Sequence, residues 1–287
     1  MLIFCFVLLT NLDTIKLLSK AILSDNKLIT ANPTLTTSSN NTSDESGLYK
    51  STATNTGEPT YYFRGNVENN YVSFASQTWR IVRINEDGTV RIVMQDGINS
   101  NTNYQFNSNY NNYTYMYYTN SQAKTQLENW YQTNIGSKSN LANKVACGNY
   151  YCEQAKVKYD DSWTSGSAVM TTYNKYTPDF KCSTDGNGKG LVNASVGLLS
   201  YDEVVYAGGY YGQNNNYYLS DLGKYWWTMS PASFSDLYSY VWNGNAAGYI
   251  NRPSVNGAFA LNSVINLKTD TQISSGNGTK NNPYLLS

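Results

Sequence analysis

The amino-acid sequence predicts an α+β fold built of antiparallel hairpins, two or three short helices and long irregular loops. Three observations support this prediction. Short runs of aromatic and β-branched residues recur in the first half of the chain, and the last third returns to such runs. Asp87-Gly88 separates two of these runs and is a strong hairpin signal. Two segments, one after Asn120 and one after Ser200, have the capping residues and apolar spacing of short helices.

The first 60 residues differ in composition from the rest of the chain. Residues 2–10 are an apolar run with the length of a secretory hydrophobic region, too short to span a bilayer. No Lys or Arg precedes this run, so residues 1–25 are interpreted as an imperfect leader, and a buried terminal segment is the alternative. Residues 26–60 are rich in Ser, Thr and Asn, which predicts a disordered stalk or linker. The folded domain is therefore expected over residues 61–287.

The first folded segment is expected to be β-structure, with strands over residues 61–67, 71–74, 78–84 and 89–94. The last two of these strands flank Asp87-Gly88 and should pair as a hairpin. Apolar side chains of the hairpin are expected to face the core: Trp79, Ile81 and Val93. Basic side chains are expected to face outward: Arg80, Arg83 and Arg91.

An Asn/Tyr-rich surface loop is expected over residues 99–120, followed by a helix over residues 121–135 with Asn120 as its N-cap. A second helix should begin after Ser200, because Ser200 and Glu203 form a capping-box pattern and Gly208-Gly209 would end the helix. Asp202 and Glu203 are adjacent carboxylates. Their position at a helix N-terminus is explained by the helix dipole, in preference to a catalytic pair.

The last third is expected to contain strands over residues 225–231, 239–242, 248–251, 259–268 and 284–286. A glycine-rich turn over residues 274–280 leads to the final strand.

Composition excludes several classes of function. The chain has 20 basic and 20 acidic residues and no net charge, which argues against an electrostatic interaction with nucleic acid or an anionic membrane. It has no histidine, which excludes Ser-His-Asp and Cys-His nucleophile systems and His-ligated zinc. We expect neither a metal nor a cofactor. The 27 tyrosines and the low content of charged residues, 14%, are typical of an aromatic, hydrogen-bonding surface.

The four cysteines are at positions 5, 147, 152 and 182. Cys5 lies within the expected leader. A disulfide between Cys152 and Cys182 would stabilise the fold by roughly 3–4 kcal/mol if the chain is exported to an oxidising compartment. Cys147 does not form a CxxC pair with Cys152, and a structural role is preferred to that of a reactive thiol.

Three stretches carry a family resemblance when they are taken in order: residues 78–97 (TWRIVRINEDGTVRIVMQDG), 197–209 (GLLSYDEVVYAGG), and 225–231 (YWWTMSP) with 263–267 (SVINL) and the closing residues 277–284. Together they resemble secreted or surface proteins of gut Firmicutes that carry a C-terminal domain of unknown function. The resemblance implies a C-type-lectin-like or formylglycine-generating-enzyme-like fold for residues 61–287. Where the family has Arg-Pro before the last strand, this chain has Asn262-Ser263, and we expect weaker bracing of the neighbouring loops.

The candidate binding surface lies between Trp227 and Asn262. Tyr, Trp, Ser, Gly and Asn are typical of adaptable binding loops, because rigid rings supply contact area and small polar groups supply hydrogen bonds. The residues expected to contact a ligand are Tyr238, Tyr240, Trp242, Asn243, Asn245, Tyr249, Asn251 and Arg252. The alternative is that the aromatic side chains pack the core. Trp226 is assigned to the core, and Tyr240 and Trp242 are left open between the two.

The sequence therefore predicts an exported cell-surface module that recognises a protein or glycan on a host or neighbouring cell, without catalysis. No nucleic acid is expected as a partner, and no membrane span beyond the leader. One alternative is a secreted glycan hydrolase that uses carboxylates, which two matched carboxylates in a deep pocket would favour. Another is a structural module of a surface layer or pilus. A shallow aromatic patch would favour the recognition module.

Overall fold

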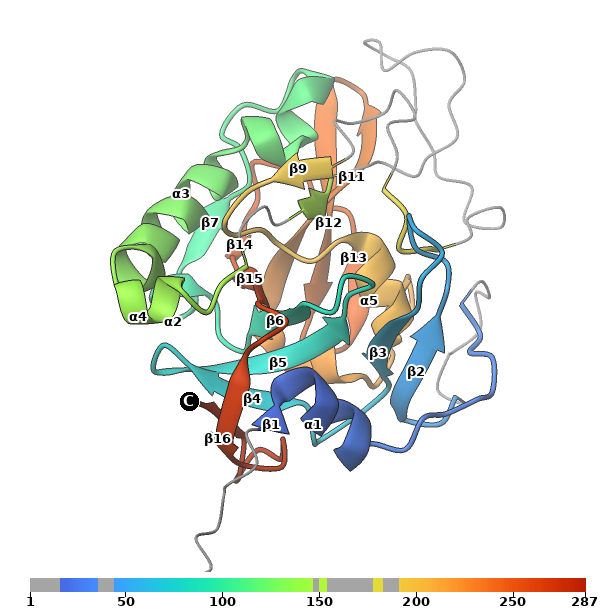
Figure 1. The fold of residues 1–287 in the computed structure, drawn as a ribbon. Helices are drawn as coiled ribbons and strands as arrows, with labels where there is room; N and C mark the ends of the chain where they lie inside the picture. Colours follow the sequence, from blue (N-terminus) through green and yellow to red (C-terminus); the bar gives the residue numbers. More distant parts are fainter. Residues whose placement is uncertain (1–15, 36–43, 147–149, 154–177, 183–190) are drawn as a thin grey trace, which may run out of the picture.

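The computed structural model of the chain describes residues 16–35, 44–146, 150–153, 178–182 and 191–287. The expected apolar leader over residues 2–10, with Cys5, lies outside the described residues, as does Cys147. The α+β prediction is confirmed, because two large sheets and a few short helices make up the described part of the chain (Figure 1).

The larger sheet has nine strands and includes both the N-terminal and the C-terminal segments. Its order is β1-β16-β17-β4-β5-β3-β2, with β6 pairing β5 and β15 pairing β6. The pair of β17 and β4 is parallel. The strands are β1 (Lys16–Leu17), β2 (Gly47–Ser51), β3 (Thr60–Arg64), β4 (Tyr71–Phe74), β5 (Gln77–Ile84), β6 (Val90–Met94), β15 (Val264–Leu267), β16 (Gln272–Ser275) and β17 (Tyr284–Leu286).

The second sheet has six strands in the order β10-β13-β12-β11-β14-β7, and β8 and β9 form a separate two-stranded ribbon. These strands are β7 (Asn103–Gln105), β8 (Tyr150–Cys152), β9 (Leu191–Asn193), β10 (Tyr210–Tyr211), β11 (Tyr225–Ser235), β12 (Tyr238–Asn245), β13 (Tyr249–Asn251) and β14 (Ala258–Ala260). The single strand expected over residues 259–268 is thus two strands, β14 and β15, in different sheets. The chain crosses from one sheet to the other between them.

The helices are short and lie around the sheets (Figure 1). They are α1 (Leu18–Asp25), α2 (Ile98–Asn101), α3 (Gln122–Tyr131), α4 (Ser139–Ala142) and α5 (Tyr201–Ala207), with single turns η2 (Tyr113–Met116), η3 (Tyr118–Asn120), η4 (Gln132–Gly136) and η6 (Tyr218–Leu222). Helix α5 contacts both β3 and β11, and so joins the two sheets. The capping box of Ser200 and Glu203 is confirmed, and Gly208 ends α5 with φ +118°.

Strands β5 and β6 form the hairpin predicted from Asp87-Gly88. Gly88 has φ +82°, a left-handed conformation that glycine adopts without steric strain. The apolar side chains expected inside are buried: Trp79, Ile81 and Val93. The expectation that the basic side chains face solvent is wrong, because all three are buried as well: Arg80, Arg83 and Arg91.

Arginines are buried in this hairpin because the sheet is covered on both faces. Trp79 packs near Trp130 of α3, with ring centroids 6.4 Å apart. Arg80 points the other way, lies 4.0 Å over the Tyr71 ring and donates from Nε to Asn70 Oδ1 at 2.7 Å. Alternation of apolar and charged residues therefore marks two buried environments here, one apolar and one polar.

Residues 16–35 and 44–60 are part of the fold, so the expectation that residues 26–60 form a disordered linker is wrong where the structure describes them. Helix α1 buries Leu18, Ala21 and Ile22 completely, and β1 pairs with β16. Strand β2 lies within the segment expected to be a linker, yet it pairs along its length with β3. The folded unit therefore begins before residue 61.

Arg64 shows why this Ser/Thr/Asn-rich segment is ordered. Its buried guanidinium donates from Nε and Nη2 to Oδ2 of Asp44, at 2.9 and 2.7 Å. Its Nη1 donates to the carbonyl oxygens of Val205 and Tyr206 in the last turn of α5, both at 2.8 Å. One buried charge thus links the N-terminal segment, β3 and α5.

The loop over residues 99–120 is more deeply packed than the sequence predicts. Phe106, Met116 and Tyr118 are fully buried. The following helix has Ser121, and not Asn120, as its N-cap, because Ser121 Oγ accepts from the backbone N–H of Lys124. The helix continues past Tyr131 as the wider turn η4.

Candidate functional site

The predicted binding residues lie on and beside the long hairpin of β11 and β12. The tip of the hairpin is formed by Asp236 and Leu237, which have φ of +49° and +66°. Two consecutive left-handed residues give the tight turn whose twist matches the paired strands. This geometry directs the tip outward, and 49% of the Leu237 side-chain surface is exposed.

The eight predicted ligand contacts divide between surface and core. Tyr238 and Asn251 are exposed, while Tyr240, Asn245, Tyr249 and Arg252 are half-buried. Trp242 and Asn243 are buried, with exposures of 2% and 4%. Their burial favours the core alternative that was left open for Trp242, and it places Asn243 in the interior as well.

Trp242 is held inside by rings from neighbouring elements. It stacks on Tyr201 of α5 with centroids 4.4 Å apart, and Tyr211 meets it edge-on at 5.3 Å. Trp226 is fully buried, as expected, and its ring lies across Gly244 of the paired strand. A Cβ atom at Gly244 would overlap the Trp226 ring, so glycine is required for this close approach.

The polar residues at the far end of β12 mainly build local structure. Asn245 Oδ1 accepts from the backbone N–H groups of Ala247 and Tyr249, at 2.9 and 3.1 Å. Asn251 Oδ1 accepts from the N–H of Arg252, whose guanidinium lies 5.5 Å over the Tyr211 ring. These residues are at the other end of the hairpin from Tyr238, so the structure does not bring the predicted set into one surface.

A cluster of large side chains does form at the hairpin tip, and we call Tyr110, Tyr113, Leu237, Tyr238 and Tyr240 the tyrosine patch. Three of its members are exposed, Tyr113, Leu237 and Tyr238, and the other two are half-buried. Tyr110 and Tyr238 stack with centroids 4.6 Å apart and planes 9° apart. The ring centroid of Tyr240 lies 6.4 Å from that of Tyr238. The negative field and hydrogen bond of Tyr110 raise the pKa of Tyr238, so the phenol stays neutral.

Three members of the patch were not among the predicted contacts: Leu237, Tyr110 and Tyr113. The two tyrosines belong to the Asn/Tyr-rich loop, which is fastened to β12 by two bonds of Ser239. Its N–H donates to the carbonyl of Tyr110 at 2.8 Å, and its hydroxyl donates to that of Asn112 at 2.6 Å. The density of tyrosines in residues 104–118 is the signal that could have suggested a binding role for this predicted surface loop.

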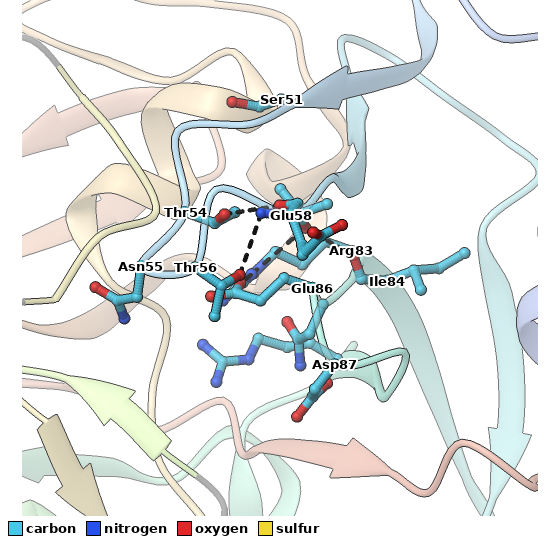
Figure 2. A network of polar contacts seen from close by, with 12 residues as sticks. Ser51, Thr54, Asn55, Thr56, Glu58, Arg83, Ile84, Glu86 and Asp87 are labelled. Atoms are coloured by element: carbon cyan, nitrogen blue, oxygen red, sulfur yellow. Dashed lines mark hydrogen bonds and ion pairs between the residues drawn. The ribbon is translucent and has the colours of Figure 1, made fainter.

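A second feature is a cavity of about 310 Å³ between the β5–β6 hairpin and the start of α5. The β2–β3 connection contributes Asn55 and Thr56 to its rim, and the hairpin loop contributes Glu86 and Asp87. Figure 2 shows these two segments facing each other, with Arg83 beside them. The Cys152–Cys182 disulfide forms part of the wall and has a Cα–Cα distance of 5.6 Å.

The floor of the cavity is a buried ion cluster of Arg83, Arg91 and Glu203. Glu203 Oε1 accepts from Nη1 of Arg91 at 2.6 Å and from Nε of Arg83 at 3.3 Å. Its Oε2 accepts from the backbone N–H of Ser200 at 3.0 Å. Arg91 also donates to Asn266 Oδ1 and to the carbonyl of Tyr150, at 2.9 and 2.6 Å.

The charges in this cluster are mutually stabilised. Burial alone would raise the pKa of Glu203, but Arg91, Arg83 and the Ser200 N–H outweigh it and hold that pKa below its ordinary value. Burial and the like charge of Arg91 lower the pKa of Arg83. Burial opposes the charge of Arg91 too, yet Glu203 overcomes this and raises the pKa of Arg91. Glu203 is thus an ionised carboxylate whose two oxygens both accept hydrogen bonds, which does not suit the proton donor of a glycan hydrolase.

Asn262 occupies the place where the resembled family has arginine. It is buried, and its Nδ2 donates to the carbonyls of Leu222, Met94 and Gln95, at 2.8, 3.1 and 3.3 Å. The neighbouring loops are therefore braced by a neutral amide at this position.

Two absences mark the described part of the chain. It contains no group of three or more His, Cys, Asp or Glu residues arranged to hold a metal ion. No helix within it has both the length and the apolar character needed to cross a membrane. Comparison of the chain with protein-family models, with curated proteins and with solved structures finds no match.

Proposed function

We propose that this chain is an exported cell-surface recognition module that binds a partner protein through the tyrosine patch. The C-type-lectin-like topology implied by the family resemblance belongs to this proposal. The antiparallel hairpins, short helices and long connections of the structure support it. The Cys152–Cys182 disulfide supports export, because disulfides persist in oxidising compartments.

The observation that carries the proposal is the exposure of large side chains at one place. Tyr113, Leu237 and Tyr238 are 37%, 49% and 38% exposed. Tyr supplies rigid contact area at low entropic cost, and the stacked pair of Tyr110 and Tyr238 is already ordered. Little conformational entropy is therefore lost when a partner covers these rings.

The chemistry of the patch favours a protein over a glycan. Leu237 is aliphatic and projects from the hairpin tip, so it gains most from an apolar pocket on a partner. Exposed amides at Asn109, Asn111 and Asn112 lie beside the rings in the sequence and provide a polar margin. An apolar centre with a polar rim is the usual arrangement of a protein–protein interface.

The test uses the full chain and cell-surface preparations from host epithelium and neighbouring bacteria. We would compare the parent with two patch variants, Tyr238→Ala and Leu237→Asn, and with Tyr225→Ala as a control. Asn tolerates the positive φ of position 237 and removes only the apolar side chain. Tyr225 is 42% exposed but lies at the far end of β11 from the hairpin tip.

We expect binding by the parent and by Tyr225→Ala, and a loss of at least about tenfold in both patch variants. The signal should vanish when the preparation is treated with protease and survive enzymatic removal of glycans. Loss on glycan removal with survival of protease would assign the patch to a glycan instead. Equal binding by the folded patch variants, or no binding by the parent, would overturn the proposal.

A further inference from the structure

The cavity over the ion cluster is separate from the tyrosine patch and has its own chemistry. No member of the patch lines it. Its volume of about 310 Å³ is at the small end of the range of ligand pockets, roughly 300–1,000 Å³. A single six-membered ring with substituents fits a cavity of this size, whereas a long chain would extend outside it.

The charged groups in the lining argue against a charged ligand. Five carboxylates and three cationic side chains line the cavity: Glu86, Asp87, Asp179, Asp202 and Glu203, and Arg83, Arg91 and Lys181. The acidic excess disfavours an anion. An ammonium group would have to approach the two guanidinium groups of the floor, so a cation is disfavoured as well.

The floor nevertheless offers a strong donor. Arg83 donates from Nε to Glu203, and its Nη1 lies 3.4 Å from Thr60 Oγ1 and 3.6 Å from Glu86 Oε2. Within the described residues, no hydrogen bond involves its Nη2. A guanidinium can donate five hydrogen bonds, so Arg83 retains capacity for a ligand oxygen.

The rim supplies acceptors and an aromatic face. Asp87 is exposed and Glu86 is half-buried, and both carboxylates line the opening. Tyr150 also lines the cavity and is 55% exposed, while the buried ring of Phe180 is part of the wall and lies 4.7 Å from the Arg83 guanidinium. Donors, acceptors and a ring in one small space match a molecule with several hydroxyl groups and an apolar C–H face.

We propose that this cavity binds one neutral sugar residue. Its hydroxyl groups would bond to Arg83, Glu86 and Asp87, and its C–H face would lie on Tyr150. The site is non-catalytic, because Glu203 is engaged by both arginines and by the Ser200 N–H. The proposal does not depend on the function of the tyrosine patch.

The experiment is saturation-transfer NMR on the full chain with three classes of probe. Neutral methyl hexosides and N-acetylhexosaminides represent the proposed ligand, glucuronate represents an anion, and glucosamine represents an ammonium. A short oligosaccharide with the same terminal residue distinguishes a free sugar from the end of a glycan. Tyr150→Ala, Tyr150→Phe and the distant Tyr225→Ala are compared with the parent.

We expect a neutral probe to bind in the millimolar range and glucuronate and glucosamine to bind more weakly. Tyr150→Ala should weaken binding by about two- to tenfold, because it removes the stacking face, and Tyr150→Phe should retain it. Tyr225→Ala should bind as the parent does. Preferred binding of either charged probe, unchanged affinity in a folded Tyr150→Ala variant, or no binding of any neutral probe would overturn the proposal.

Discussion

Glu203 is the side chain on which the polar interior of this protein depends. It is 3% exposed and forms ion pairs with both Arg83 and Arg91. It also completes the capping box of α5 with Ser200. Removing one partner of a buried ion cluster leaves the others as uncompensated charges. The same residue thus stabilises the start of a helix and the floor of a cavity.

Glu203→Gln should lower the free energy of unfolding by about 3–5 kcal/mol at pH 7, because two buried guanidinium groups lose their counter-charge. Urea unfolding followed by tryptophan fluorescence measures this. Glu86→Gln is the matched control. Its contact with Arg83 is longer, at 3.6 Å, and nearer the surface, so its loss should cost no more than about 1 kcal/mol.

The difference in unfolding free energy between the parent and Glu203→Gln should depend on pH. The folded-state pKa of Glu203 lies below its ordinary value of 4.5, so its contribution to stability is complete above that pH. The contribution is lost as pH falls through the folded-state pKa. The difference in unfolding free energy between the parent and Glu203→Gln should therefore shrink as pH falls below 4.5. A difference that stays constant between pH 7 and pH 3 would contradict the assignment.

At the scale of elements, α5 is fixed at both ends by residues far away in the sequence. Its N-terminus bonds to Arg83 and Arg91 through Glu203, and its last carbonyls accept from Arg64. A helix of seven residues is too short to be stable alone, so these contacts and its packing decide whether it forms.

Arg64→Ala should therefore destabilise the protein by about 3–5 kcal/mol, since it removes the buried cation that donates to Asp44 and to two helix carbonyls. Differential scanning calorimetry measures the loss of stability, and circular dichroism at low temperature checks that the variant still folds. Arg252→Ala serves as the control, because Arg252 is half-buried and its guanidinium lies over the Tyr211 ring near the surface. Equal effects of the two substitutions would show that Arg64 does not have this role.

A further prediction at this scale concerns the stability of the β11–β12 hairpin. Gly244→Ala should cost about 1–3 kcal/mol, because the new methyl group must displace the Trp226 ring. Gly57→Ala is its control, since a Cβ at that position meets no atom and only the positive φ is unfavourable. Thermal unfolding of the two variants side by side separates steric overlap from backbone strain.

Local signals predicted local structure well in this chain. The capping box at Ser200 and the turn at Asp87-Gly88 act within a few residues, so the sequence alone was sufficient for both. Burial of Trp242 depends on Tyr201, and burial of Arg91 depends on Glu203. These partners are distant in the sequence, and no local pattern specifies them.

The candidate site was also predictable only where local sequence signals were sufficient. Tyr238 and Tyr240 could be selected from the sequence because of their residue type, but Tyr110 joins them only after the Asn/Tyr-rich loop folds against β12. The cavity is formed by segments from residues 55 to 266, so its existence could not be inferred before the fold was known.

At the scale of the whole molecule, the N-terminal segment closes the core beside the C-terminal strands. Strand β1 pairs with β16, and the Tyr284 hydroxyl of β17 donates to Asp25 Oδ2 at 3.0 Å. Figure 1 shows α1 and β1 beside β16 and the C-terminus. The described residues before Thr60, which include a Ser/Thr/Asn-rich stretch, are thus part of the folded structure.

Ile22→Ala tests this arrangement. Ile22 is fully buried, so the substitution should cost about 2–4 kcal/mol, whereas Leu23→Ala in the same helix should change stability by less than about 0.5 kcal/mol because Leu23 is 41% exposed. Chemical denaturation of both variants measures these changes in the free energy of unfolding. If α1 were a detached leader, neither change would alter the midpoint.

The central claim is that the hairpin tip, and not the neighbouring core aromatics, is the binding surface. Hydroxyl-radical footprinting of the full chain tests it directly, first alone and then with a partner-containing surface preparation. We expect rapid oxidation of Tyr113, Leu237 and Tyr238 and slow oxidation of Trp242 in the free protein. On binding, the first three should be protected and Tyr225 should not. Rapid oxidation of Trp242 in the free protein, or protection at Tyr225 while Tyr238 stays reactive, would contradict it.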